Sequence, residues 1–200
     1  TSAPEATLSP RVLRMDNVSR VVQVNRKDGI SVLKMGWVED NNWLINAGTN
    51  SLSFIEAGSV QVVQKVGLDG GIPLSMAIAD GRVYILLNDS IKVVDIGSFT
   101  IVKTISPIPG GAMSIAASAD GKLLALGISD NKTQLINPED GSVIRNLKSN
   151  YGGWAVAFSP DSQFIFSGTS QGILKWETAS GIFKFVNGGQ DKIIKSLVIS

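Results

Sequence analysis

Residues 154–177 read Trp-Ala-Val-Ala-Phe-Ser-Pro-Asp-Ser-Gln-Phe-Ile-Phe-Ser-Gly-Thr-Ser-Gln-Gly-Ile-Leu-Lys-Trp-Glu. The first five residues are uniformly apolar, which is typical of a strand that is buried on both faces. The segment 159–162 predicts a turn, because Pro presets φ and Asp tolerates the turn geometry. Two further apolar runs, 164–167 and 173–176, predict a hairpin, and 182–186 alternates like a half-exposed outer strand. The stretch therefore predicts four consecutive antiparallel strands.

The same pattern recurs along the chain with a period of about 40 residues. Pairs of apolar runs around a short polar turn occur at 43–56, 82–95, 122–137 and 163–177, with a shorter copy at 11–16. Each copy ends in a polar residue. The apolar residue just before it recurs at spacings of 40, 39, 42 and 40 residues: Met15, Ile55, Val94, Ile136 and Trp176. A fixed period of this length indicates a repeat architecture in which each repeat is one supersecondary unit.

The inner strands and the turns of the repeat favour a β-propeller. Residues 74–79 and 112–118 mix small with medium apolar side chains, which suits strands crowded around a narrow axis. Asp80-Gly81 and Asp120-Gly121 stand between apolar runs, where Asp-Gly is a strong hairpin signal. Four antiparallel strands per repeat are typical of a propeller blade. We therefore predict an all-β fold: a β-propeller with four complete four-stranded blades and partial blades at both ends.

With these positions in place, the chain resembles the WD40 repeat family. Residues 154–162 and 167–181 are similar to that family's innermost strand, Ser-Gly pair, third strand and Trp-Asp position, and the resemblance extends over nearly the whole chain. The repeats are degenerate, because no histidine is present for the family's Gly-His dipeptide. The Trp-Asp pair takes the forms Met15-Asp16, Ile55-Glu56, Val94-Asp95, Ile136-Asn137 and Trp176-Glu177. The resemblance implies a WD40-like propeller in which the buried His-Asp-Ser/Thr-Trp hydrogen-bond network cannot form.

The sequence leaves two blade arrangements open. We expect a tail at 1–10 and a propeller at 11–200, in which 11–16 and 19–25 are a third and a fourth strand and 193–200 is an innermost strand. In the arrangement that we favour, the chain is an incomplete part of a larger propeller, for example a seven-bladed one. In the other, the first two strands and the last one close a five-bladed, ligand-binding ring.

Composition excludes several kinds of site. The 200 residues contain no Cys and no His, which removes disulfide frameworks, thiolate and imidazole zinc sites, and Ser-His-Asp triads. The net charge is +1, from 18 Lys and Arg against 17 Asp and Glu, so the basic footprint of a nucleic-acid-binding protein is missing. We expect no cofactor, no metal and no direct contact with nucleic acid.

Neither a membrane span nor a secretory signal is predicted. The charge-free stretch at 104–119 contains two prolines and is shorter than the roughly 18 residues that a membrane-spanning helix needs. Residues 1–10 lack the basic and apolar regions of a signal peptide. We expect no membrane insertion and a cytoplasmic location, with the nucleus as an alternative and secretion left open.

Four aspartates recur at the predicted blade turns. As a group they could bind a cation, but each stands where a turn uses Asp to bond its own backbone. We favour this structural interpretation for Asp80, Asp120, Asp140 and Asp161.

The predicted function is a non-catalytic protein–protein interaction scaffold, a WD40-like propeller module within a larger assembly. This prediction depends on the resemblance and on the missing catalytic groups, because a fold alone does not imply a function. The expected partners are other proteins, among them a chain or segment that completes the propeller. The alternative is a propeller enzyme, similar to lactonases or quinoproteins, with carboxylates or a metal at the channel mouth. The inner strands carry no acidic residue, which argues against this alternative.

Candidate binding residues lie on the loops that lead from one blade to the next. In propellers that resemble this chain, these loops share the face at which ligands most often dock, and loops commonly carry recognition residues. The loop at 148–153 combines a cation with an aromatic residue and adjoins a tryptophan, and Tyr and Trp dominate interface hot spots. Structural filling is the competing interpretation of this aromatic pair. The predicted protein-binding residues are Lys148, Tyr151, Trp154, Asp191 and Lys192.

Overall fold

The computed structural model describes residues 33–38, 43–56, 59–129, 132–149, 151, 153–188 and 193–199. This part of the chain contains sixteen strands and no helix. The strands are β1 (Lys34–Val38), β2 (Trp43–Gly48), β3 (Ser51–Glu56), β4 (Gln61–Gly67), β5 (Ser75–Ala79), β6 (Arg82–Leu86), β7 (Ile91–Asp95), β8 (Thr100–Ile105), β9 (Ala112–Ala117), β10 (Leu124–Ile128), β11 (Lys132–Ile136), β12 (Val143–Lys148), β13 (Ala155–Phe158), β14 (Phe164–Gly168), β15 (Gly172–Glu177) and β16 (Phe183–Gly188).

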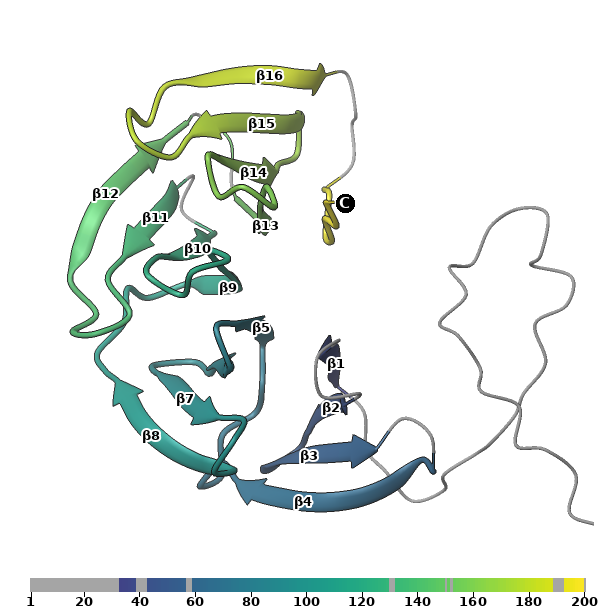
Figure 1. The fold of residues 1–200 in the computed structure, drawn as a ribbon. Coiled ribbons are helices and arrows are strands. Elements are labelled where there is room, and N and C mark those ends of the chain that lie inside the picture. Colours follow the sequence, from purple (N-terminus) through teal and green to yellow (C-terminus); the bar gives the residue numbers. More distant parts are fainter. Residues whose placement is uncertain are drawn as a thin grey trace, which may run out of the picture.

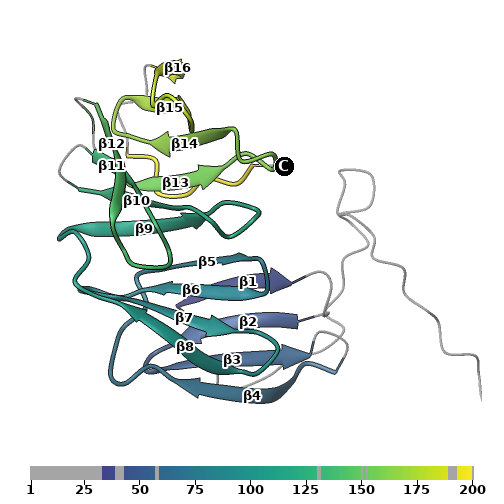
Figure 2. The same cartoon turned by 60° about the vertical axis from the view of Figure 1, so that its left-hand side comes forward.

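The strands form four blades, each a four-stranded sheet in sequence order with antiparallel neighbours. Figure 1 shows the blades as an arc, with the first strand of each blade toward the centre and the fourth at the periphery. In Figure 1 the blades β1–β4 and β13–β16 stand at the two ends of this arc, and Figure 2 shows β13–β16 at the top, well apart from β1–β4 at the bottom. The predicted all-β propeller fold with four complete blades is confirmed.

Each pair of neighbouring blades shares an apolar core. In β6, Val83 and Ile85 belong to a core shared with the first blade, whereas Tyr84 and Leu86 belong to a core shared with the third. Buried residues of the third and fourth blades form the remaining core. Because both faces of a middle strand are covered, these strands are continuous apolar runs rather than alternating ones.

Small residues let the inner strands approach one another at the axis. A Cβ atom added to Gly36 in β1 would lie only 2.5 Å from Cδ1 of Ile78 in β5. Between β9 and β5, the backbone N–H of Ile115 donates to Oγ of Ser75 at 3.2 Å. Small side chains in the inner strands therefore have the packing role that the sequence indicated.

Asp-Gly pairs form the hairpin turns that the sequence predicts. Asp80 and Gly81 join β5 to β6, and both have left-handed backbone conformations, with φ of 48° and 67°. Such conformations are those of the two-residue turns that match the twist of a hairpin. Gly121 and Gly141 also have positive φ, of 66° and 75°.

The fourth blade contains one buried hydrogen bond between a tryptophan and a serine, a pair that also occurs in the network expected of WD40 repeats. Nε1 of Trp176 in β15 donates to Oγ of Ser167 in β14 at 2.9 Å, and both residues are 1% exposed. The complete network needs a histidine, which the chain lacks. One tryptophan–serine bond nevertheless forms, because both side chains stand on the same face of adjacent strands.

Two strand predictions are corrected. Trp154 lies just before β13, although its backbone N–H still donates to the carbonyl of Gly168 at 2.9 Å. Residues 193–199 do not form the predicted innermost strand. A strand needs a hydrogen-bonded neighbour along its length. Among the described residues, this segment has one backbone hydrogen bond to a neighbour, from Ile194 N–H to the Thr169 carbonyl at 3.3 Å. The predicted strands at 11–16 and 19–25 lie outside the described residues.

No helix long and apolar enough to cross a membrane occurs among the described residues.

Candidate functional site

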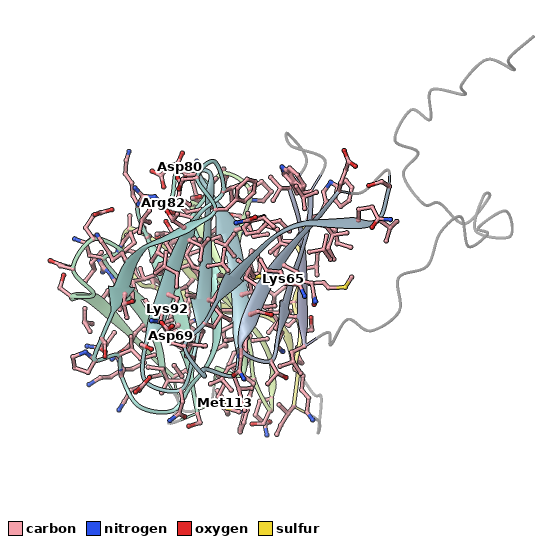
Figure 3. All side chains as sticks on the ribbon, turned by 90° about the horizontal axis from the view of Figure 1, so that it is seen from below. Lys65, Asp69, Asp80, Arg82, Lys92 and Met113 are labelled. Carbon is pink, nitrogen blue, oxygen red and sulfur yellow. The ribbon has the colours of Figure 1, made fainter. Side chains whose placement is uncertain are left out.

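The propeller has two faces that carry different loops. At one face, which we call the mouth face, the first strand of each blade begins after the loop from the preceding blade. At the other, the turn face, lie the turns that join first to second and third to fourth strands. Figure 3 shows Asp80 and Arg82 at the turn face, and Asp69, Lys92 and Met113 toward the mouth face.

A cavity of about 460 Å³ opens on the mouth face where the inner strands begin, and we call it the axial cavity. The described residues that line it are Lys34, Leu74, Met113, Trp154, Ile193 and Lys195. The first five recur at spacings of 40, 39, 41 and 39 residues, so they occupy equivalent positions of successive repeats. The repeat thus places one side chain per blade around a common centre.

Backbone hydrogen bonds hold two of these positions at the ends of inner strands, and a third position stands next to a residue that is held in this way. The N–H of Leu74 donates to the Leu86 carbonyl at 2.9 Å, and the N–H of Trp154 donates to the Gly168 carbonyl at 2.9 Å. Ile193 precedes the residue that bonds Thr169. A Cβ atom on Gly168 would lie 2.7 Å from Cγ2 of Ile194, so this glycine lets the C-terminal segment lie against the fourth blade.

The axial cavity combines apolar surface with positive charge. Met113 and Ile193 are each 42% exposed, and Leu74 and Trp154 are half-buried. Lys34 and Lys195 are exposed, and no ion pair joins either ammonium group to another described residue. This arrangement can hold an apolar group and an anionic group at the same time.

A second cavity, of about 590 Å³, adjoins the axial cavity on the mouth face and shares Leu74 with it. It lies between two loops of the second blade, whose residues include Ile72 and Asn88. Nζ of Lys92 forms an ion pair with Oδ2 of Asp69 at 3.1 Å in its wall. The mouth face therefore offers two adjoining hollows rather than a flat surface.

The structure separates the residues that the sequence grouped as one binding patch. Trp154 lines the axial cavity, whereas the ring of Tyr151 packs edge-on against Phe185 of β16, with the centroids 5.5 Å apart. Lys148 is exposed at the end of β12 and does not line the cavity. The predicted Asp191 and Lys192 lie outside the described residues.

Sequence reasoning missed most of the axial cavity: Lys34, Leu74, Met113, Ile193 and Lys195. The signal that could have found four of them is the repeat itself. Once Trp154 is selected, the residues one period apart from it are the ones that meet at the axis. Lys195 has no such signal, because it stands two residues after the repeated position, which Ile193 occupies.

Three of the four turn aspartates, Asp120, Asp140 and Asp161, bond their own turns, as predicted. The Ser118 hydroxyl donates to Asp120 at 2.8 Å and, with the backbone N–H of Lys122, holds the pKa of Asp120 below its ordinary value. Hydroxyls of Ser159 and Ser142 lower the pKa of Asp161 and Asp140 in the same way. Among the described residues, no group of three or more His, Cys, Asp or Glu side chains is placed to hold a metal ion.

Charged groups at the turn face join neighbouring blades. Glu139 of the third blade accepts from Nη1 of Arg82 at 3.2 Å and pairs with Lys103, both of the second blade. Lys103 first, and then Arg82, lowers the pKa of Glu139. Arg145 Nη1 donates to the Ser180 carbonyl of the fourth blade at 2.6 Å, beside an apolar groove of about 680 Å³ between these two blades.

A comparison with protein-family models shows the family to which the chain belongs. The model described as "Domain of unknown function (DUF5074)" matches residues 39–194. The chain belongs to the DUF5074 family. The match extends from just after β1 to the C-terminal segment beside the axial cavity, so it includes most of the DUF5074 propeller described here.

Solved structures similar to this DUF5074 propeller include Kuenenia stuttgartiensis hydrazine synthase, with a TM-score of 0.65 and 21% identity over 86% of this chain and 51% of that one. Another is the β-propeller domain of Myceliophteria thermophila Cps50 (Swd1), with a TM-score of 0.69 and 9% identity over 82% of this chain and 57% of that one. The DUF5074 chain thus spans between half and three fifths of these structures. No match is found among curated proteins.

At these identities the likeness shows the fold alone. The expected resemblance to WD40 repeats is supported in part, by a neighbour that is a β-propeller domain. The family that matches is DUF5074, and membership of the WD40 repeat family is not confirmed.

Proposed function

We propose that this DUF5074 propeller is a non-catalytic binding module that holds another protein against its mouth face. The observation that carries the proposal is the axial cavity, in which equivalent positions of successive repeats converge. Because the blades repeat around one axis, equivalent positions meet at the axial cavity. The side chains of the loops and strand ends at this place can differ between blades without disturbing the apolar cores between the blades.

The composition of the mouth face supports a protein as the partner. Met113 and Ile193 expose apolar surface beside a half-buried tryptophan, and interfaces are enriched in Trp and Met at their centres. The second cavity extends the surface toward the second blade. A protein partner can cover both hollows, which one small ligand would not do.

Site-directed photocrosslinking in the native source tests this proposal. A benzoylphenylalanine at Met113 should crosslink one defined protein, and the same group at Val102 should not. Val102 is a matched control because it is apolar and 52% exposed, but lies on β8 at the periphery. Equal crosslinking from both positions, or none from Met113, would contradict the proposal.

The crosslinked protein, once purified, allows a quantitative test. The double substitution Tyr151→Ala with Trp154→Ala should weaken its binding at least about tenfold, which corresponds to roughly 1.4 kcal/mol. Val102→Ala should leave the dissociation constant unchanged. Thermal unfolding of each variant separates a loss of binding from a loss of folding.

A further inference from the structure

Of the described lysines, Lys34 and Lys195 are the two that line the axial cavity. Lys92, Lys103 and Lys122 form ion pairs with Asp69, Glu139 and Asp120. Neither Lys34 nor Lys195 has an ion pair within the described part of the chain, and the described residues that line their cavity include no carboxylate.

These two lysines also stand together in space, although 161 positions separate them in the sequence. Lys34 begins β1 and Lys195 belongs to the C-terminal segment. Figure 1 shows these two segments on the inner side of the arc, which β5, β9 and β13 also line. Two ammonium groups on one cavity attract an anion and repel a cation.

The remaining lining residues are apolar: Leu74, Met113, Trp154 and Ile193. Methionine adapts its shape to a partner, and tryptophan is a frequent interface anchor. The exposure of Met113 and Ile193 makes the cavity an open mouth. Small ligands are usually bound in pockets that bury most of their surface. An open mouth instead suits a side chain projecting from a larger partner.

We infer that the axial cavity binds an acidic peptide segment of the partner protein, with a carboxylate next to a large apolar side chain. The carboxylate lies at Lys34 and Lys195, and the apolar side chain enters the ring formed by Leu74, Met113, Trp154 and Ile193. This inference rests on the proposed function, and it adds the chemical class of the segment that is recognised.

Selection from a phage-displayed library of random peptides, with the whole chain as bait, tests the inference. The selected peptides should be enriched in Asp or Glu adjacent to Leu, Ile, Phe or Trp. The best peptide is then labelled with fluorescein, and its dissociation constant is measured by anisotropy at low and high salt. Salt should weaken binding, because exposed charges are screened.

Charge reversal supplies the decisive variant. Lys34→Glu with Lys195→Glu should weaken binding of the selected peptide by at least about tenfold. The matched control, Lys65→Glu with Lys184→Glu, changes the net charge equally but alters exposed lysines on the peripheral strands β4 and β16. It should change the dissociation constant by less than about threefold, through long-range attraction alone.

The outcomes separate the inference from the function on which it rests. Selected peptides without acidic residues, equal effects of the two double variants, or no selected peptide would each overturn the inference. If peptides without acidic residues are selected and Trp154→Ala weakens them, the mouth face still binds protein and only the acidic specificity fails. If Met113 also yields no specific crosslink, the proposed function fails as well.

Discussion

The turn face and the axial cavity of the propeller use their polar groups in opposite ways. At the turn face, aspartates bond the serines of their own turns, and Glu139 joins two blades through Arg82 and Lys103. At the mouth face, the axial cavity has two lysines that form no ion pair among the described residues, beside exposed apolar side chains.

This difference indicates which polar groups stabilise the fold and which are available to bind a partner. A polar group that is already bonded within the chain contributes to stability and offers little to a partner. A charged group without an internal partner, next to exposed apolar surface, can bond a partner without first breaking an ion pair within the chain. Substitutions at the turn face should therefore lower stability, whereas substitutions at the mouth face should lower affinity.

The largest expected effect is that of Trp176→Ala, near the turn face. Trp176 is 1% exposed and bonds Ser167, so its removal leaves a large cavity and a buried hydroxyl without its partner. Such substitutions cost about 3–5 kcal/mol of unfolding free energy. Urea denaturation measures this loss. Trp176→Phe should cost less, since it keeps most of the apolar volume, and an equal cost would contradict the packing argument.

Gly121→Ala should have the next largest effect on stability. Both Gly121 and Gly81 have left-handed φ, of 66° and 67°, in which a side chain costs about 1–2 kcal/mol. A Cβ atom on Gly121 would also lie 2.9 Å from Cβ of Asp80 in the second blade, whereas one on Gly81 meets nothing within 4 Å. Gly121→Ala should thus exceed the matched variant Gly81→Ala in urea denaturation. Equal losses would show that the blades adjust without cost.

The single variants Trp154→Ala and Tyr151→Ala separate the contribution to binding from the contribution to stability on the mouth face. Trp154 lines the axial cavity and Tyr151 packs on Phe185, so Trp154→Ala should account for most of the tenfold loss of affinity, about 1.4 kcal/mol. Tyr151→Ala should mainly lower the midpoint of thermal unfolding, because an aromatic pair contributes about 0.5–1.5 kcal/mol. Calorimetric titration with the crosslinked partner measures the affinities. A larger loss of affinity from Tyr151→Ala would move the site toward the periphery.

The smallest expected effect is the dependence of stability on pH. In the folded chain serine hydroxyls hold the pKa values of Asp120, Asp140 and Asp161 below the ordinary value of 3.8. A lowered pKa stabilises the fold above the ordinary value, and this stability is lost as the pH falls through the folded pKa. The unfolding free energy should be level near neutrality and fall below about pH 4.

The matched control for this pH effect removes the hydroxyl donors, Ser118→Ala, Ser142→Ala and Ser159→Ala together. With these donors gone, the pKa values of the aspartates return toward the ordinary value, and the acid decline should be less steep. Urea denaturation at several pH values measures both chains. An identical decline would mean that other carboxylates govern the acid stability.

Much of the fold followed from local pattern. The apolar runs and Asp-Gly turns predicted the hairpins, because such signals act over a few residues and each blade pairs its strands in sequence order. The errors lie where pairing depends on distant segments. Residues 193–199 have strand-like sequence but no strand pairing, and Trp154 stands one residue outside the strand that was predicted to include it.

The sequence by itself determined the repeat: its period, its four strands, its turn aspartates and the equivalence of positions such as Leu74 and Met113. The tertiary structure decided which of those equivalent positions meet, that Tyr151 turns away to Phe185, and that Lys195 joins Lys34 at the axis. The physical reason is that a period specifies which residues have the same local environment. The curvature that brings them to one point comes from the packing of one blade on the next, which depends on contacts such as that of Gly36 with Ile78, between residues 42 positions apart.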